Sequence, residues 1–199
     1  MEHLAVLRGG LAGRCSSAIP YGEAPCGGAA RARIFKHEAA AVDTVNAHVY
    51  LTEDEDDGGS TAIPERRTPQ GHPDLSAGAR RSRRSTQATG SPGRACPTRS
   101  GGGVATRMQV PGSTVFRGGE GIWYHAGVIY FSTKGTNQVW ASNVAAATIS
   151  VLSDARSMAM PGIRGVDNLT VSCCGDVLVA EDTGSMQIVA ILPSGSSSP

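Results

Sequence analysis

The stretch GVDNLTVSCCGDVLVAEDTG, from Gly165 to Gly184, decides the fold, because it holds two apolar runs joined by a short polar turn. β-Branched and aliphatic runs around a turn rich in Gly, Asp and Ser are typical of a β-hairpin. Carboxylates lie at both open ends of this hairpin, since Asp167 precedes the first run and Glu181 and Asp182 follow the second. Two strands and a turn do not require acids there.

Two earlier segments repeat the same pattern. HEAAAVDTVNAHVYLTED covers 37–54 and GEGIWYHAGVIYFST covers 119–133. The later apolar runs of the second and third segments begin at Val128 and Val177, 49 residues apart. A period of about 40–50 residues suits one four-stranded blade of a β-propeller.

Strand-like material follows each of the last two hairpins. QVWA begins at Gln138 and QIVA begins at Gln187, at the same offset from the preceding run. The β-branched residues in Thr148–Leu152 favour another strand over a helix. We therefore predict hairpins over 46–54, 121–133 and 169–181, with following strands at 138–142 and 187–192.

Three hairpins are too few to close a propeller, which has at least four blades. The predicted fold class is therefore all-β, an incomplete β-propeller-like array of antiparallel hairpins with disordered segments.

Charge is distributed unevenly along the chain. Residues 34–57 combine one lysine with seven carboxylates, whereas 58–107 hold nine arginines and no lysine. Segments without apolar periodicity are predicted to be disordered. The predicted organisation is a disordered, unassigned 1–33, a first propeller hairpin at 34–57, a low-complexity Arg/Gly/Ser/Pro segment at 58–103, two blades at 104–193 and a tail at 194–199.

Several classes of function are disfavoured. The five cysteines form no CxxC pair, which indicates neither a zinc site nor a disulfide framework. No stretch approaches the roughly 20 apolar residues of a membrane span. The arginine segment lacks interleaved aromatic residues, so we expect no nucleic-acid partner. No secretory signal is recognisable at the start, and the location in the cell stays open.

The acids are expected to meet at one place. The first residue of one strand and the last of its partner are neighbours in an antiparallel hairpin. If the hairpins are the inner strands of successive blades, their open ends all face one rim of a central channel. The acids and amides expected at that rim are Glu38, Glu53, Asp54, Glu120, Asp167, Asn168, Glu181 and Asp182.

Carboxylates in one place repel each other unless a cation lies between them. Calcium prefers the oxygen ligands that Asp, Glu and Asn supply. Lys134 lies at the same rim and would bind an anionic substrate. For any one of these acids, a turn residue or an exposed acidic loop is the competing interpretation, and repetition in three units favours a shared site.

The motifs HEAAAVD, HVYLTEDEDDGG, GGEGIWYH, GVIYFSTKGTNQVWA and GVDNLTVSCCGDVLVAEDTG resemble the PhoX-type alkaline phosphatases, a family of exported bacterial enzymes. The resemblance covers 34–59 and about 104–193. It implies a β-propeller that holds calcium and iron through carboxylates and hydrolyses phosphate monoesters. It also implies that Glu38, Glu120, Asp167, Glu181 and Asp182 are metal ligands or their neighbours.

Two alternatives stay open. The strand-turn-strand unit at 166–182 also resembles calcium-dependent lactonase-type propellers. A non-catalytic propeller fragment that binds a metal or a partner is the other interpretation.

Overall fold

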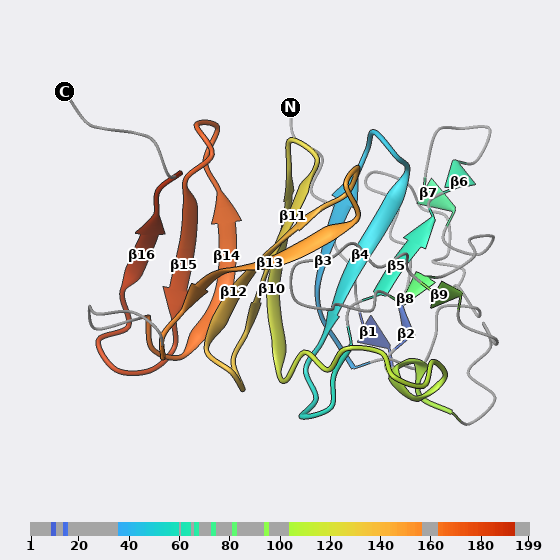
Figure 1. Ribbon diagram of the computed structural model, residues 1–199, viewed down its shortest axis with the longest axis horizontal. Coiled ribbons are helices and arrows are strands. Elements are labelled where there is room, and N and C mark those ends of the chain that lie inside the picture. The colour runs from blue at the N-terminus through green and yellow to red at the C-terminus, as the bar shows by residue number, and fades with distance from the viewer. Residues whose placement is uncertain are drawn as a thin grey trace.

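The regular secondary structure of the described residues is almost entirely antiparallel strands (Figure 1). The computed structural model describes residues 36–59, 104–156 and 163–193, together with the backbone of short strands at 9–10, 14–15, 61–64, 66–67, 73–74, 81–82 and 94–95. Its one described helix is a single 3₁₀ turn, η1, at Thr106–Met108. No helix among the described residues has the length and hydropathy to cross a membrane.

Three sheets make up most of the fold, and in each of them the strands are arranged side by side in sequence order. The first sheet has the order β3-β4-β5-β8-β9. Its strands are β3 (His37–Asp43), β4 (His48–Glu53), β5 (Thr61–Pro64), β8 (Arg81–Ser82) and β9 (Arg94–Ala95). Two further pairs join β1 (Gly9–Gly10) to β2 (Arg14–Cys15) and β6 (Arg66–Arg67) to β7 (Pro73–Asp74).

The second and third sheets are simple meanders. The second has the order β10-β11-β12-β13 and the third has the order β14-β15-β16. Their strands are β10 (Gly119–His125), β11 (Val128–Thr133), β12 (Gln138–Asn143), β13 (Thr148–Asp154), β14 (Val166–Val171), β15 (Val177–Glu181) and β16 (Ile188–Ile191).

The three sheets lie side by side in chain order, as Figure 1 shows from blue to red. The innermost strand of the second sheet, β10, contacts both β3 and β14, the innermost strands of its neighbours. Each sheet therefore behaves as one blade around a common set of inner strands. The predicted fold class, an all-β incomplete propeller-like array, is confirmed.

The predicted hairpins and their following strands are present at β3–β4, β10–β11 and β14–β15, with β12 and β16 behind the last two. The strand predicted at 148–152 is β13. The first hairpin is longer than predicted, because β3 already begins at His37. Its inward side chains are small alanines, whose low strand preference hides the pattern in the sequence.

The predicted disorder of 1–33 and 58–103 concerns residues that lie almost entirely outside the described part of the chain. Within 58–103, β5 pairs with β4 from His48 with Pro64 to Leu51 with Thr61. β5 thus occupies the place in the first sheet that β12 occupies in the second.

Side chains between the blades form two apolar cores. Between the first and second sheets, Phe116 packs edge-on against Phe131 and Trp140, with ring centroids 5.0 and 5.3 Å apart. Between the second and third sheets, Val139 packs with Val166 and Val179 in a purely aliphatic cluster. Burial of these alternating side chains fixes the strand register, since a slip of one residue would turn each of them to the opposite face.

Candidate functional site

Each hairpin contains a β-bulge near its open end. In the first hairpin the register shifts between His37 and Ala40. The first residue of the bulge is an acid in every case, Glu38, Glu120 or Asp167. The register shifts at the equivalent place in the other hairpins, between Gly119 and Ile122 and between Val166 and Leu169. A bulge changes the direction of its side chains relative to the regular ladder. The three acids therefore occupy the same local backbone position in their hairpins.

A backbone hydrogen bond closes the open end of each hairpin. The amide after the second strand donates to the carbonyl two residues before the acid, in the pairs Asp54 to Lys36 (3.1 Å), Lys134 to Gly118 (2.7 Å) and Asp182 to Gly165 (3.0 Å). Asp54, Lys134 and Asp182 therefore occupy one equivalent position. The second hairpin has a cation where the first and third have an acid.

Hydroxyl groups join the second and third bulges to the blade that precedes each of them. Thr52 lies opposite the first bulge, and its Oγ1 donates to the carbonyl of Glu120 at 2.5 Å. Ser132 is the equivalent residue of the second hairpin, and its Oγ donates to the carbonyl of Asp167 at 2.5 Å. The backbone of each of these acids is thus fixed by the preceding blade. In the third hairpin Ala180 stands at this position and has no hydroxyl to donate.

Glu120 has the most perturbed carboxylate at the rim. Its side chain is only 7% exposed, and its ion-pair partner Lys134 Nζ is 4.0 Å from Oε1. Burial, together with the neighbouring charges of Glu38 and Asp167, raises the pKa of Glu120 to about 7, although Lys134 acts to lower it. A carboxylate in this setting gains free energy from any additional cation that approaches it.

Glu38 responds to the same group of charges. Burial raises the pKa of Glu38, and the charges of Asp54 and Asp167 act in the same direction, whereas Lys36 and Lys134 lower it. Asp54 of the first hairpin and Asp167 of the third therefore raise the pKa of both Glu38 and Glu120. That Glu38, Asp54, Glu120 and Asp167 share one ion site stays a prediction.

Two lysines compensate part of this negative charge. Lys134 donates a hydrogen bond to Asp182 Oδ2, which links the second hairpin to the third. The other carboxylate oxygen, Asp182 Oδ1, is buried and has no hydrogen-bond partner among the described residues. Lys36 Nζ lies 3.2 Å from Asp54 Oδ2. The bond to Asp182 raises the pKa of Lys134, so this lysine stays charged.

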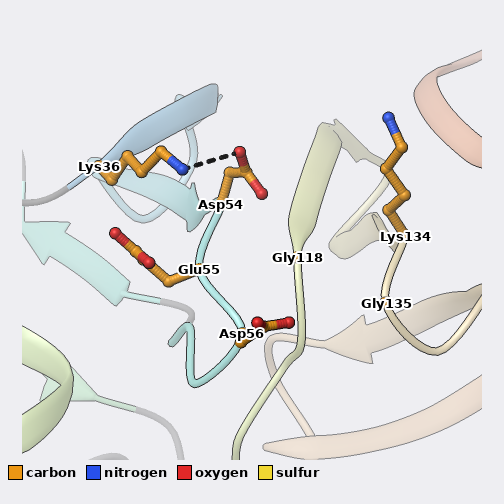
Figure 2. Close-up of a pocket in the computed structure, with 7 residues that line it drawn as sticks. All are labelled: Lys36, Asp54, Glu55, Asp56, Gly118, Lys134 and Gly135. Atoms are coloured by element: carbon orange, nitrogen blue, oxygen red, sulfur yellow. Dashed lines mark ion pairs between the residues drawn. The ribbon is translucent and has the colours of Figure 1, made fainter.

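A shallow hollow of about 300 Å³ opens beside this charged group. Figure 2 shows Lys36 pointing toward Asp54, with Lys134 on the other side of the segment that carries Gly118. Glu55 and Asp56 complete the acidic side of the hollow. Two lysines and several carboxylates thus face a space that solvent and small ions can enter.

Three of the predicted rim residues make other contacts instead. Glu53 is fully buried, and its Oε1 accepts a hydrogen bond from Arg107 Nη1 at 2.8 Å. Glu181 Oε1 accepts from the amide of Arg164 at 2.7 Å. Asn168 Oδ1 accepts from the amide of Leu169 at 2.8 Å. These contacts hold the local backbone, and they direct the three side chains to partners other than the central acids.

The sequence interpretation missed several contributors. Lys36 stands two residues before its bulge acid, where the other hairpins have glycine, so the repeat alignment itself contained the signal. Thr52 and Ser132 are also found by aligning the hairpins. Arg107 could not be found this way, because it lies outside every repeat and reaches Glu53 across 54 positions.

The donor chemistry of the rim fits a hard cation better than a soft one. Carboxylate oxygens suit calcium, and the free cysteines described, Cys173 and Cys174, lie at the opposite end of their hairpin. Within the part of the chain that the structure describes, no three His, Cys, Asp or Glu side chains are already grouped as metal ligands. Loading a cation would therefore require the rim side chains to draw closer.

The fold and this rim define an all-β, propeller-like array with acids at the open ends of its hairpins. Comparison with known proteins finds no family model and no curated protein that matches the chain. A function for this chain must therefore be inferred from the geometry of the rim and from the sequence motifs.

Proposed function

We propose that the rim binds calcium, and that the chain is a PhoX-like phosphatase fragment whose family reaction is the metal-dependent hydrolysis of phosphate monoesters. The observation that carries the proposal is Glu120, a carboxylate 7% exposed, with a pKa raised to about 7 by burial and by acids from the neighbouring blades. Such a group is stabilised by a cation.

Glu120, Glu38 and Asp167 would hold the ion, with Asp54 and Asp182 next to them. A cation bound there would polarise a phosphoryl oxygen or activate a bound water. Iron enters the proposal only through the family resemblance. The calcium part rests on the oxygen donors themselves.

Lys134 would orient the substrate. Its Nζ lies between Glu120 and Asp182 on the side of the hollow, where a phosphate monoester would present its negative oxygens. An ammonium group there supplies charge-assisted hydrogen bonds to phosphate. A cation at the carboxylates and a lysine beside it would hold the two ends of one phosphoryl group.

Calcium titration by calorimetry tests the site directly, with Glu120→Gln as the diagnostic variant and Asp56→Asn as its matched control. Asp56 is 92% exposed and pairs only loosely with Arg117 at 3.4 Å. We expect Glu120→Gln to weaken calcium binding at least about tenfold, and Asp56→Asn to change it less than about twofold at physiological salt. Equal effects at the two positions would remove the proposed site.

Turnover separates the activities. Release of phosphate from an aryl phosphate with calcium and iron present supports the phosphatase, whereas opening of a lactone ring selects the lactonase-type alternative. Calcium binding without turnover on either substrate identifies a non-catalytic cation-binding fragment. In each case Lys134→Ala shows whether the lysine acts on the anionic substrate, because only phosphate ester turnover should depend on it.

A further inference from the structure

The outer face of the third sheet is a second feature of the array, independent of the rim. Cross-strand pairing places Leu178 beside Ala190 and Ala180 beside Ile188, so these four side chains share one face of the sheet. Thr170, paired with Leu178, extends the face onto β14. None of the five carries a charge, and a hollow of about 540 Å³ lies over part of this face, with Ala39, Ala40, Ile122 and Trp123 of the first two sheets also lining it.

Register shows what this face corresponds to. Ile122 pairs with Phe131 just after the second bulge, as Leu169 pairs with Val179 just after the third. The residues of the second sheet equivalent to Leu178, Ala180 and Ile188 are therefore Tyr130, Ser132 and Val139.

Those equivalents form the contact between the second and third sheets. Ser132 and Val139 are both 0% exposed, and Val139 and Tyr130 pack into the aliphatic cluster of the third sheet. Ile188, by contrast, is 68% exposed. The third sheet thus presents, with Leu178 and Ala180 half-buried and Ile188 exposed, the same face through which the preceding blade is packed.

The substitutions along this face indicate its partner. A following blade in the same register would offer the carbonyl of its bulge acid, which Thr52 and Ser132 satisfy with a hydroxyl. Ala180 cannot donate to such a carbonyl, and Leu178 replaces the hydroxyl of Tyr130 with an aliphatic group. A buried carbonyl without a donor is costly, so the face suits an apolar partner surface.

The opposite end of the array does not supply that surface. On the outer side of the first sheet, Val49 is 6% exposed and Leu51 is 1% exposed, so this side is already covered. A second copy of the chain therefore offers one matching open aliphatic sheet face in its described residues, which is its own third sheet.

We propose that the chain forms a twofold symmetric dimer through the outer faces of two third sheets, with Leu178, Ala180 and Ile188 at its centre. A self-complementary patch is what a twofold interface requires. Two sheets packed face to face bury interdigitating aliphatic side chains about 10 Å apart. Ile188 is then buried by its symmetry mate, as Val139 is buried within the chain.

Light scattering coupled to gel filtration, over a range of protein concentrations, tests the proposal with the full chain. We expect a mass twice that of one chain, which falls to the monomer mass on dilution. Ile188→Asp and Leu178→Asp should each weaken association about 100-fold or more, because each would bury an unpaired charge at the centre of the interface.

Val45→Asp is the matched control, because Val45 is apolar, 79% exposed and located in the turn of the first hairpin. It should leave the dimer intact. Three outcomes would overturn the proposal: a monomer at every concentration, a dimer that Ile188→Asp leaves intact, or a monomer in which the amides of β16 are strongly protected from exchange. The last result would show that another part of the same chain covers the face.

Discussion

Two glutamates on neighbouring strand ends, Glu53 and Glu120, show how differently one array treats the same chemical group. Glu53 is fully buried and bonded to Arg107 at 2.8 Å and to the amide of Gly59 at 3.2 Å. Glu120 is nearly as buried, but its cation, Lys134, stays 4.0 Å away and is shared with Asp182. Burial raises the pKa of both carboxyls, and Arg107 counteracts it at Glu53.

The difference separates a carboxylate that completes the fold from one that is left free to bind. At Glu53, the arginine supplies a fixed counter-charge from a loop outside the repeats. At Glu120 the counter-charge is incomplete, and other acids surround the group. A buried acid alone therefore does not indicate a binding site, and the proposed function depends on the incomplete counter-charge at Glu120, which would favour an additional cation.

Removing the cation at Glu53 should have the largest effect. Arg107→Ala leaves a fully buried carboxylate unpaired, so we expect the free energy of unfolding to fall by about 3–5 kcal/mol at neutral pH. Chemical denaturation followed by circular dichroism measures it. The double variant Arg107→Met with Glu53→Gln should recover most of the loss, since it removes both charges. No recovery would mean that Arg107 stabilises through packing.

The next effect concerns the pH dependence at Glu120. Its carboxyl in the folded chain has a pKa of about 7, above the ordinary value of 4.5, so the folded state binds more protons between those values. This contribution to stability is complete below pH 4.5 and is lost as the pH rises through 7, on the order of 2 kcal/mol without calcium. Glu120→Gln should flatten this slope, as thermal unfolding from pH 4 to 8 would reveal.

Calcium should reverse that trend. A bound cation requires the ionised carboxylate, so calcium affinity in the native chain should rise from pH 6 to pH 8, with release of nearly one proton per ion at pH 6 and almost none at pH 8. Calorimetry in buffers of different ionisation enthalpy counts the protons. Calcium binding that releases no proton at pH 6 would show that Glu120 is not a ligand.

A smaller effect is expected at Thr52, which lies between the two glutamates. Thr52→Val removes the hydroxyl that bonds the Glu120 carbonyl, at a cost of about 1–2 kcal/mol in unfolding free energy. Thr52→Ser keeps the hydroxyl and should restore both stability and calcium affinity. If valine weakens stability but leaves the affinity unchanged, the bond supports the fold without positioning the acid.

The smallest effect belongs to the exposed pair of Asp56 and Arg117. Their side chains are 92% and 54% exposed, at 3.4 Å. Asp56→Asn should change the free energy of unfolding by less than about 0.5 kcal/mol, because solvent and salt screen such pairs. A larger loss would mean that the acidic loop takes part in the fold.

The sequence was sufficient for the repeating hairpins and for the equivalent position of an acid in each of them. Alternating apolar residues and the recurring acid before each first strand carry that information locally. It was not sufficient to distinguish Glu53 from Glu120, because the distinction depends on Arg107, which comes from outside the repeats. The bulges could not be predicted either, because a register shift depends on how two strands pair and the sequence of one strand does not determine it.

The β-bulge that holds each acid also has a consequence for how such chains change over time. Glu38, Glu120 and Asp167 lie where two residues face one, outside the regular ladder of paired residues. An exchange of side chain there alters the charge at the open end of the hairpin without removing a register pair. The three blades can therefore diversify their chemistry one position at a time while the scaffold that carries them stays the same.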